Sequence, residues 1–188
     1  MEENNGTEAI KNYNQAADLD KASVKAILRI GQLYNRGRNY NSALEYYKKA
    51  SDIDPSFAPA YREKAEIYNR AGQHQNAVDQ FKKFLELNNN LSAKARYAGF
   101  LYQAKKYKES IDQGNEVFNK DSSSVYLYRY LGYSYYENGD YPSGLNKIEG
   151  FFRKAVNNTV KIIPQDYEYY GKLLAKTGKD SLGVINLL

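Results

Sequence analysis

Arginine and tyrosine are the residues of this 188-residue chain whose types and spacing point most clearly to chemistry. Three arginines recur at intervals of about 34 residues, namely Arg62, Arg96 and Arg129. Three tyrosines follow one another at helical steps, namely Tyr126, Tyr130 and Tyr133. A guanidinium presents paired donors to a carboxylate. A tyrosine ring offers a large contact area, few rotatable bonds and a hydroxyl. Both residue types favour recognition of a polar ligand over bond-making chemistry.

The chain lacks the residues that catalysis would need. The single histidine, His74, stands where other parts of the chain have a tyrosine, so we interpret it as a packing residue near a turn. Because the chain has no cysteine, thiolate catalysis, disulfides and cysteine metal sites are excluded. We find no glycine-rich phosphate loop, metal-ligand cluster or nucleophile elbow. We therefore expect no enzyme, no cofactor and no metal.

Composition indicates one continuous body and leaves the compartment open. With 42% hydrophobic residues and a mean hydropathy of -0.77, the apolar material is spread thinly along the chain, as an elongated solenoid requires. No apolar run approaches the roughly 20 residues that span a membrane. The acidic, polar N-terminus shows no signal peptide. A cysteine-free chain fits the cytoplasm and the periplasm equally well.

Apolar residues recur at three- and four-residue steps, which predicts amphipathic helices of about fourteen residues. Small residues are expected to let paired helices approach, among them Gly31, Ala65, Ala98 and Gly132. Glycines are expected to adopt left-handed turns between helices, at Gly37, Gly72, Gly139 and Gly178. Asn39 and Asp140 are positioned to cap the following helices, and Pro142 suits a first turn.

The same helix-pair pattern returns every 34 residues or so. Its clearest occurrences are Ile27, Ile30, Gly31, Tyr34, Ala43, Tyr47, Ala50 and Pro55; Tyr61, Ala65, Tyr68, Gly72, Ala77, Phe81 and Phe84; and Tyr128, Leu131, Gly132, Tyr135, Gly139, Tyr141, Ile148 and Phe151. This pattern resembles the tetratricopeptide repeat. The resemblance implies an all-α, right-handed superhelical solenoid of stacked antiparallel helix pairs, and a role in holding another polypeptide.

In that register the chain is a single array over residues 1–188. Residues 1–23 are expected to hold the second helix of a truncated repeat, and residues 164–188 a partial repeat. Four units lie between them, at 24–57, 58–90, 91–124 and 125–158. The array thus begins and stops within a repeat, which suggests a segment of a longer protein or an array that continues by pairing with another chain.

Two stretches depart from the pattern. In the unit at 91–124, Lys94 takes a bulky site, while Ser110 and Gly114 replace an alanine and an aromatic residue, so its second helix is expected to pack loosely. The long connection at 154–164 can extend a helix or form a loop, and the sequence does not decide between them.

The resemblance also implies which side chains face a concave groove formed by the first helices. The expected partner-binding residues are Arg62, Arg96, Phe100, Tyr126, Arg129, Tyr130 and Tyr133. Other interpretations stay open. Tyr130 and Tyr133 can instead pack against the next repeat, and the arginines can be solvated or paired with acidic neighbours. The lysine and asparagine clamp by which some relatives hold a C-terminal carboxylate has no matching window here.

A protein-interaction scaffold is therefore the leading hypothesis. Nucleic-acid binding is the alternative, favoured by a net charge of +5 and a pI near 9.1, but 22 acidic residues lie among the basic ones, so we do not expect it. Self-assembly through uncapped repeat ends is a third hypothesis. The sequence does not identify the partner.

Overall fold

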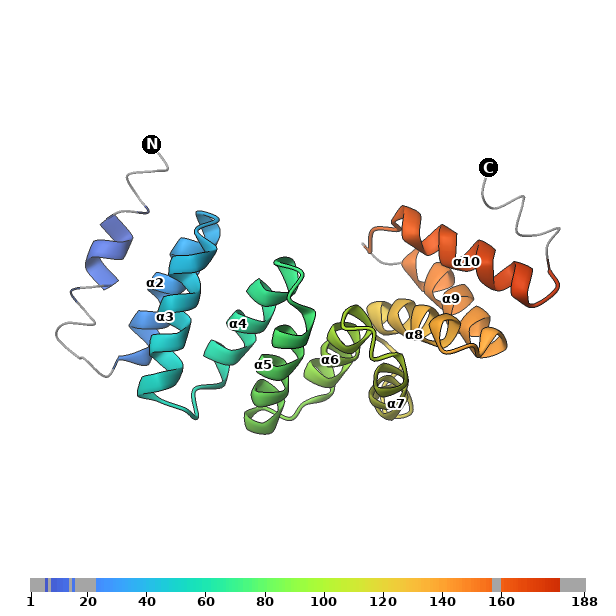
Figure 1. The fold of residues 1–188 in the computed structure, drawn as a ribbon, viewed down its shortest axis with the longest axis horizontal. Helices are drawn as coiled ribbons and strands as arrows, with labels where there is room; N and C mark the ends of the chain where they lie inside the picture. Colours follow the sequence, from blue (N-terminus) through green and yellow to red (C-terminus); the bar gives the residue numbers. More distant parts are fainter. Residues whose placement is uncertain (1–5, 7, 14, 16–22, 157–159, 180–188) are drawn as a thin grey trace. The chain divides into compact units, whose positions relative to one another are not determined.

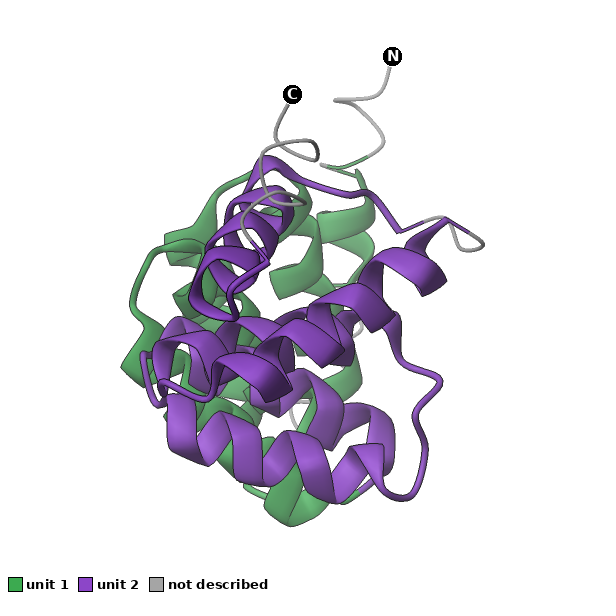
Figure 2. Cartoon of the chain, turned by 90° about the vertical axis from the view of Figure 1, so that its right-hand side faces the viewer, with its two compact units in different colours: residues 1–89 green, residues 90–188 purple. Residues whose placement is uncertain are grey.

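The computed structural model describes residues 6, 8–13, 15, 23–156 and 160–179, and these residues form helices and turns without any strand. The chain divides into two compact units, Met1–Asn89 and Asn90–Leu188 (Figure 2). Each unit is built from helix pairs joined by short turns (Figure 1). None of the described helices has the length and apolar character that a membrane span requires.

The described residues of unit 1 contain two complete helix pairs. Helix α2 (Val24–Arg36) packs against α3 (Tyr40–Ile53), and α4 (Ala58–Arg70) packs against α5 (His74–Leu87), while α3 also contacts α4. Residues 8–13, which precede these pairs, are helical as well. One core cluster joins the first pair to α4, because Ile27, Tyr47 and Ile67 all lie within it and are almost fully buried.

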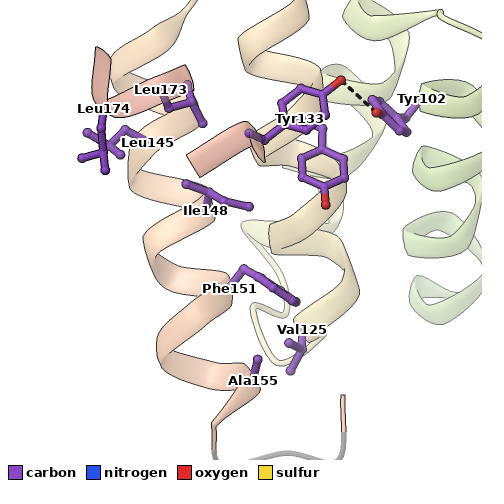
Figure 3. Close-up of a cluster of buried hydrophobic side chains, with 10 residues drawn as sticks. Tyr102, Val125, Tyr133, Leu145, Ile148, Phe151, Ala155, Leu173 and Leu174 are labelled. Atoms are coloured by element: carbon purple, nitrogen blue, oxygen red, sulfur yellow. Dashed lines mark hydrogen bonds between the residues drawn. The ribbon is translucent and has the colours of Figure 1, made fainter. Parts of the chain in front are cut away.

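In the part of unit 2 that the structure describes, there are two helix pairs and one further helix. Helix α6 (Leu91–Gln103) pairs with α7 (Tyr107–Phe118), and α8 (Val125–Glu137) pairs with α9 (Tyr141–Ala155). Helix α10 (Pro164–Lys176) packs against α9 and α8. Its Leu173 and Leu174 enter a core that includes Tyr133, Ile148 and Phe151 (Figure 3).

Small residues bring the paired helices together, as the sequence predicts. A Cβ atom added to Gly31 would lie 2.5 Å from Cε1 of Tyr47, and one added to Gly132 would lie 3.2 Å from the backbone nitrogen of Ile148. Ala65 and Ala98 are fully buried. A larger side chain at these positions would therefore push the helices apart.

Caps and turns confirm most of the sequence predictions and correct one. Asn39 and Asp140 accept hydrogen bonds from the backbone nitrogens of Ser42 and Ser143, and Gly72, Gly139 and Gly178 have positive φ. At the first turn, however, the left-handed residue is Arg38, with φ 59°, and Gly37 has φ -73°. The glycine lies one position too early there, so an arginine adopts a conformation that is costly for a residue with a Cβ atom.

The prediction of loose packing in α7 is wrong. Ser110 is fully buried and donates to the carbonyl of Ala98 at 2.8 Å, so its hydroxyl is satisfied. Gly114 makes room for the next repeat, because a Cβ atom there would lie 2.7 Å from Cδ2 of Leu131. The missing aromatic side chain is thus replaced by a leucine from α8.

The long connection after α9 is not a helical extension in its described part. Helix α9 ends at Ala155, and residues 160–163 are not helical. Residues 157–159 lie outside the described residues, as do most of the predicted helix at 1–23 and the last nine residues of the partial repeat at 164–188.

Candidate protein-binding surfaces

Arg129 lies at the centre of a buried polar cluster in unit 2. Its side chain is 8% exposed, and that of Asp166 on α10 is fully buried. Nε and Nη2 of Arg129 donate to the two carboxylate oxygens of Asp166 at 2.7 and 2.8 Å, and Nη2 also donates to the carbonyl of Lys161 at 2.7 Å. Asp166 accepts further bonds from the hydroxyl of Tyr133 and the backbone nitrogen of Ile163. The cluster fastens α10 to α8.

The charges of this cluster compensate one another. Burial alone lowers the pKa of Arg129, but the hydrogen bond and the charge of Asp166 outweigh it and raise that pKa. Burial, followed by the hydrogen bond to Asp166, raises the pKa of the Tyr133 hydroxyl far above its ordinary value of 10.0. The ring of Phe151 lies 4.5 Å from the Arg129 guanidinium and covers it. Arg129 therefore stays charged, and the ion pair that it forms is internal.

For three of the seven predicted contact residues, the prediction that they face a partner is wrong. Phe100, Arg129 and Tyr133 are buried within unit 2, with 4%, 7% and 1% of their surfaces exposed. Helix α10 covers Arg129 and Tyr133, which confirms the open alternative that Tyr133 packs against the next repeat. The partner of Arg129 lies 37 residues further along the chain, and nothing in the local spacing indicated it.

Tyr130 belongs to a tyrosine cluster that joins α6, α8 and α10. The rings of Tyr133 and Tyr169 stack with centroids 4.1 Å apart, and the Tyr102 hydroxyl lies 3.0 Å from that of Tyr169. Tyr169 donates in turn to Glu137. Tyr130 is half-buried, because its ring lies against Gly99 and has its centroid 5.9 Å from that of Tyr102. Most of these tyrosines stabilise unit 2 and are not exposed to a partner.

Two predicted residues of unit 2 remain at its surface. Tyr126 is 51% exposed, and the guanidinium of Arg129 lies 5.6 Å from its ring. Arg96 is also exposed, with its guanidinium 5.9 Å from the ring of Phe100. With the half-buried Tyr130, they are the predicted contact residues of α6 and α8 that keep exposed surface.

Unit 1 carries a larger polar surface, which we call the α2–α4 face. It is made of exposed or half-buried polar side chains of α2 and α4, namely Lys25, Arg29, Gln32, Asn35, Arg36, Arg62, Glu63, Glu66, Asn69 and Arg70. Hydrogen bonds connect α2 to α4 across this face. Gln32 donates to Glu63 at 3.2 Å, and Arg70 donates to Asn35 at 3.1 Å. The predicted contact residue Arg62 lies here, exposed and paired with Glu63 at 3.0 Å.

Tyr47 of α3 lies in the core beneath the α2–α4 face. Its ring packs under Gly31, and the residue is fully buried. The hydroxyl has no hydrogen-bond partner of acceptable geometry. Burial and then the Glu63 carboxylate raise the pKa of Tyr47, while Asn35 and Arg70 lower it. Tyr47 thus packs against α2 at Gly31 and shares its core cluster with Ala60 and Ile67 of α4.

The described residues offer no arrangement suited to metal binding. No group of three histidine, cysteine, aspartate or glutamate side chains lies together in the described part of the chain. Nδ1 of His74 lies 3.0 Å from the amide oxygen of Asn69, which fits the packing role that the sequence suggested.

The fold and these surfaces define a helical-repeat protein of stacked antiparallel pairs, so the predicted all-α solenoid is confirmed. The sequence profile of the tetratricopeptide repeat family matches residues 1–58 and 28–92. Residues 1–92 of the chain therefore match the tetratricopeptide repeat family. No curated protein sequence is significantly similar to it.

Solved structures share the fold at low sequence identity. The crystal structure of YrrB, described as a TPR protein with an unusual peptide-binding site, has a TM-score of 0.75 and 15% identity, covering 93% of this chain and 88% of that one. A MamA crystal structure has a TM-score of 0.74 and 17% identity, with 87% of each chain covered. MamA from Desulfovibrio magneticus RS-1 has a TM-score of 0.75 and 20% identity, covering 89% of this chain and 91% of that one. These likenesses concern the fold.

Proposed function

We propose that this protein is a non-catalytic scaffold that holds a segment of another protein against the first helices of its repeats. The observation that supports this proposal is the α2–α4 face. The apolar residues of α2 and α4 are buried in the core of unit 1. Their polar residues stay at the surface, where hydrogen bonds connect the two helices. A surface whose side chains already hold one another in place loses little conformational entropy when it binds. The peptide-binding site described for YrrB shows that a relative in fold can serve this purpose.

The face of unit 1 is a better candidate than α8. In unit 2, α10 covers Arg129 and Tyr133, the residues that sequence reasoning favoured. The predicted contact residues that stay accessible on α6 and α8 are Arg96, Tyr126 and Tyr130, which we propose as a second contact region. Arg62 remains a proposed contact residue of the α2–α4 face.

Photo-cross-linking tests this proposal. A photoreactive phenylalanine derivative is placed at Arg36, which is exposed on α2, and in a matched control at Lys49, which is exposed on α3. After irradiation in lysate of the source organism, we expect polypeptide cross-links that are specific to position 36 and are identified by mass spectrometry. Equal yields from both positions would contradict the proposal, as would cross-links at position 36 only to nucleic acid or only to a second copy of this chain.

A further inference from the structure

The α2–α4 face has an excess of positive charge. Helix α2 contains no acidic residue, and its exposed stripe consists of Lys25, Arg29 and Arg36. Helix α4 adds Arg62 and Arg70. Glu63 and Glu66 oppose these five positive charges, and Glu63 already accepts hydrogen bonds from Arg62 and Gln32. The local potential is therefore positive, although the chain as a whole is only mildly basic.

Two of these guanidinium groups are bonded to neutral amides. Nη1 of Arg29 donates to Gln32 at 2.9 Å, and Nη1 of Arg70 donates to Asn35 at 3.1 Å. An amide oxygen orients an arginine without neutralising its charge. Arg129, whose guanidinium is bonded to a buried carboxylate in unit 2, shows the contrasting arrangement. Because a guanidinium binds an oppositely charged carboxylate more strongly than a neutral amide oxygen, an incoming carboxylate would displace either amide.

We propose that the α2–α4 face binds an acidic segment of a partner polypeptide, whose side-chain carboxylates replace the amides of Gln32 and Asn35 as acceptors for Arg29 and Arg70. This proposal rests on the proposed function and specifies the chemistry of the segment that is held.

The displacement of the Asn35 amide by a ligand carboxylate also affects the buried hydroxyl of Tyr47. This hydroxyl has no hydrogen-bond partner of acceptable geometry. Once Arg70 turns to a ligand carboxylate, the amide of Asn35 is released and can turn its oxygen toward Tyr47. Leaving a buried donor unsatisfied is costly, so satisfying it on binding adds to the affinity. Tyr47 thus acts as a positioning residue beneath the site and does not touch the ligand.

Fluorescence anisotropy with two defined probes tests the charge preference. One is a short dye-labelled peptide of alternating aspartate and serine, and the other is the matched peptide of asparagine and serine. We expect the wild-type protein to bind the acidic peptide, with an affinity that falls as salt is raised, and to bind the neutral one at least about tenfold more weakly. Equal binding of both probes would overturn the proposal.

Two double variants test whether the acidic peptide binds at the α2–α4 face. The double variant Arg29→Gln, Arg70→Gln is expected to weaken acidic-peptide binding by about tenfold or more. The control Lys48→Gln, Lys49→Gln removes the same charge from exposed positions on α3 and is expected to change affinity less than about twofold. Equal losses in the two variants would show non-specific attraction and overturn the proposal.

Substitution of Tyr47 by phenylalanine tests the buried step. Tyr47→Phe removes an unsatisfied hydroxyl, so the free protein should be at least as stable as wild type, whereas acidic-peptide affinity should fall by about three- to tenfold. Unchanged affinity would refute the role of Tyr47. If position-specific cross-links persist while the peptides fail to discriminate, the scaffold function stands and the acidic preference is wrong. If a single-stranded oligonucleotide binds in place of the acidic peptide, the proposal is also wrong.

Discussion

The ion pair between Arg129 and Asp166 should be among the most sensitive points of unit 2. Asp166 is fully buried and accepts bonds from Arg129, Tyr133 and the backbone of Ile163. In Asp166→Asn one of the two acceptors becomes an NH₂ group. If that group faces Nη2 of Arg129 and the backbone nitrogen of Ile163, donors meet donors. The variant also leaves a buried guanidinium without a counter-charge.

The expected cost follows from this geometry. Breaking a buried, hydrogen-bonded ion pair by removing one partner typically costs about 3–5 kcal/mol, against about 1 kcal/mol or less for an exposed pair. We therefore expect Asp166→Asn to lower the free energy of unfolding by about 3–5 kcal/mol. Arg129→Met should cost a similar amount, because it leaves the Asp166 carboxylate buried without its cation.

A double-mutant cycle separates this explanation from ordinary loss of packing. In the double variant Arg129→Met, Asp166→Asn both charges are gone, and the amide oxygen can still accept from Tyr133. The combined loss should be smaller than the sum of the two single losses by about 2 kcal/mol or more. Denaturant unfolding followed by circular dichroism gives the free energies, and hydrogen exchange should show the loss of protection in α8 and α10 and not in α2–α5. Additive losses, or a cost of Asp166→Asn below about 1 kcal/mol, would refute the reasoning.

Two further outcomes are expected. Gly31→Ala should destabilise the protein by about 1–3 kcal/mol in a thermal or denaturant unfolding experiment. The reason is that the added Cβ atom would lie 2.5 Å from the ring of the fully buried Tyr47. A neutral effect would show that the ring can shift freely. In a spectrophotometric titration, buried tyrosines such as Tyr133 and Tyr169 should not ionise near the ordinary pKa of 10.0, since burial and then their hydrogen bonds to carboxylates raise their pKa values. Their contribution to stability is complete below pH 10 and is lost as the pH rises above it, so their ionisation should coincide with unfolding; a single step near pH 10 with unchanged circular dichroism would contradict this.

The fold was readable from the sequence because it depends on local spacing. Helices α2, α4, α6 and α8 begin at Val24, Ala58, Leu91 and Val125. The periodic pattern fixes such positions through apolar faces and caps, which involve residues a few places apart. One cap was nevertheless missed, since Asn90 accepts from the backbone nitrogen of Ala93 at 2.9 Å.

Turn and packing details were less predictable. The position of the left-handed residue is set by where the preceding helix ends, and α2 ends so that Arg38 takes that conformation although Gly37 precedes it. Gly114 appeared to be a defect because the aromatic side chain expected there is missing. Its space is filled by Leu131, a residue from the next repeat. A pattern that compares repeats position by position does not detect such exchange between neighbours.

The candidate site shows the same limit more sharply. Arg62, Arg96 and Arg129 were grouped because they recur at equivalent positions, yet their environments differ. Arg62 is exposed and paired with an adjacent glutamate, whereas Arg129 is buried against Asp166. Arg129 is distinguished by α10, which carries its partner Asp166. The spacing of equivalent residues carries no information about that contact.

This difference moves the expected binding chemistry from unit 2 to unit 1. A guanidinium that already holds a buried carboxylate gains little from a second one, because its charge is compensated and its access to solvent is small. Arg29 and Arg70 donate to amide oxygens and lie at the surface, so a carboxylate ligand there replaces a bond between a charge and a neutral group with one between opposite charges. The acidic partner should therefore be recognised where the array leaves its arginines uncompensated, and Arg129 and Tyr133 of α8 should act to keep α10 in place.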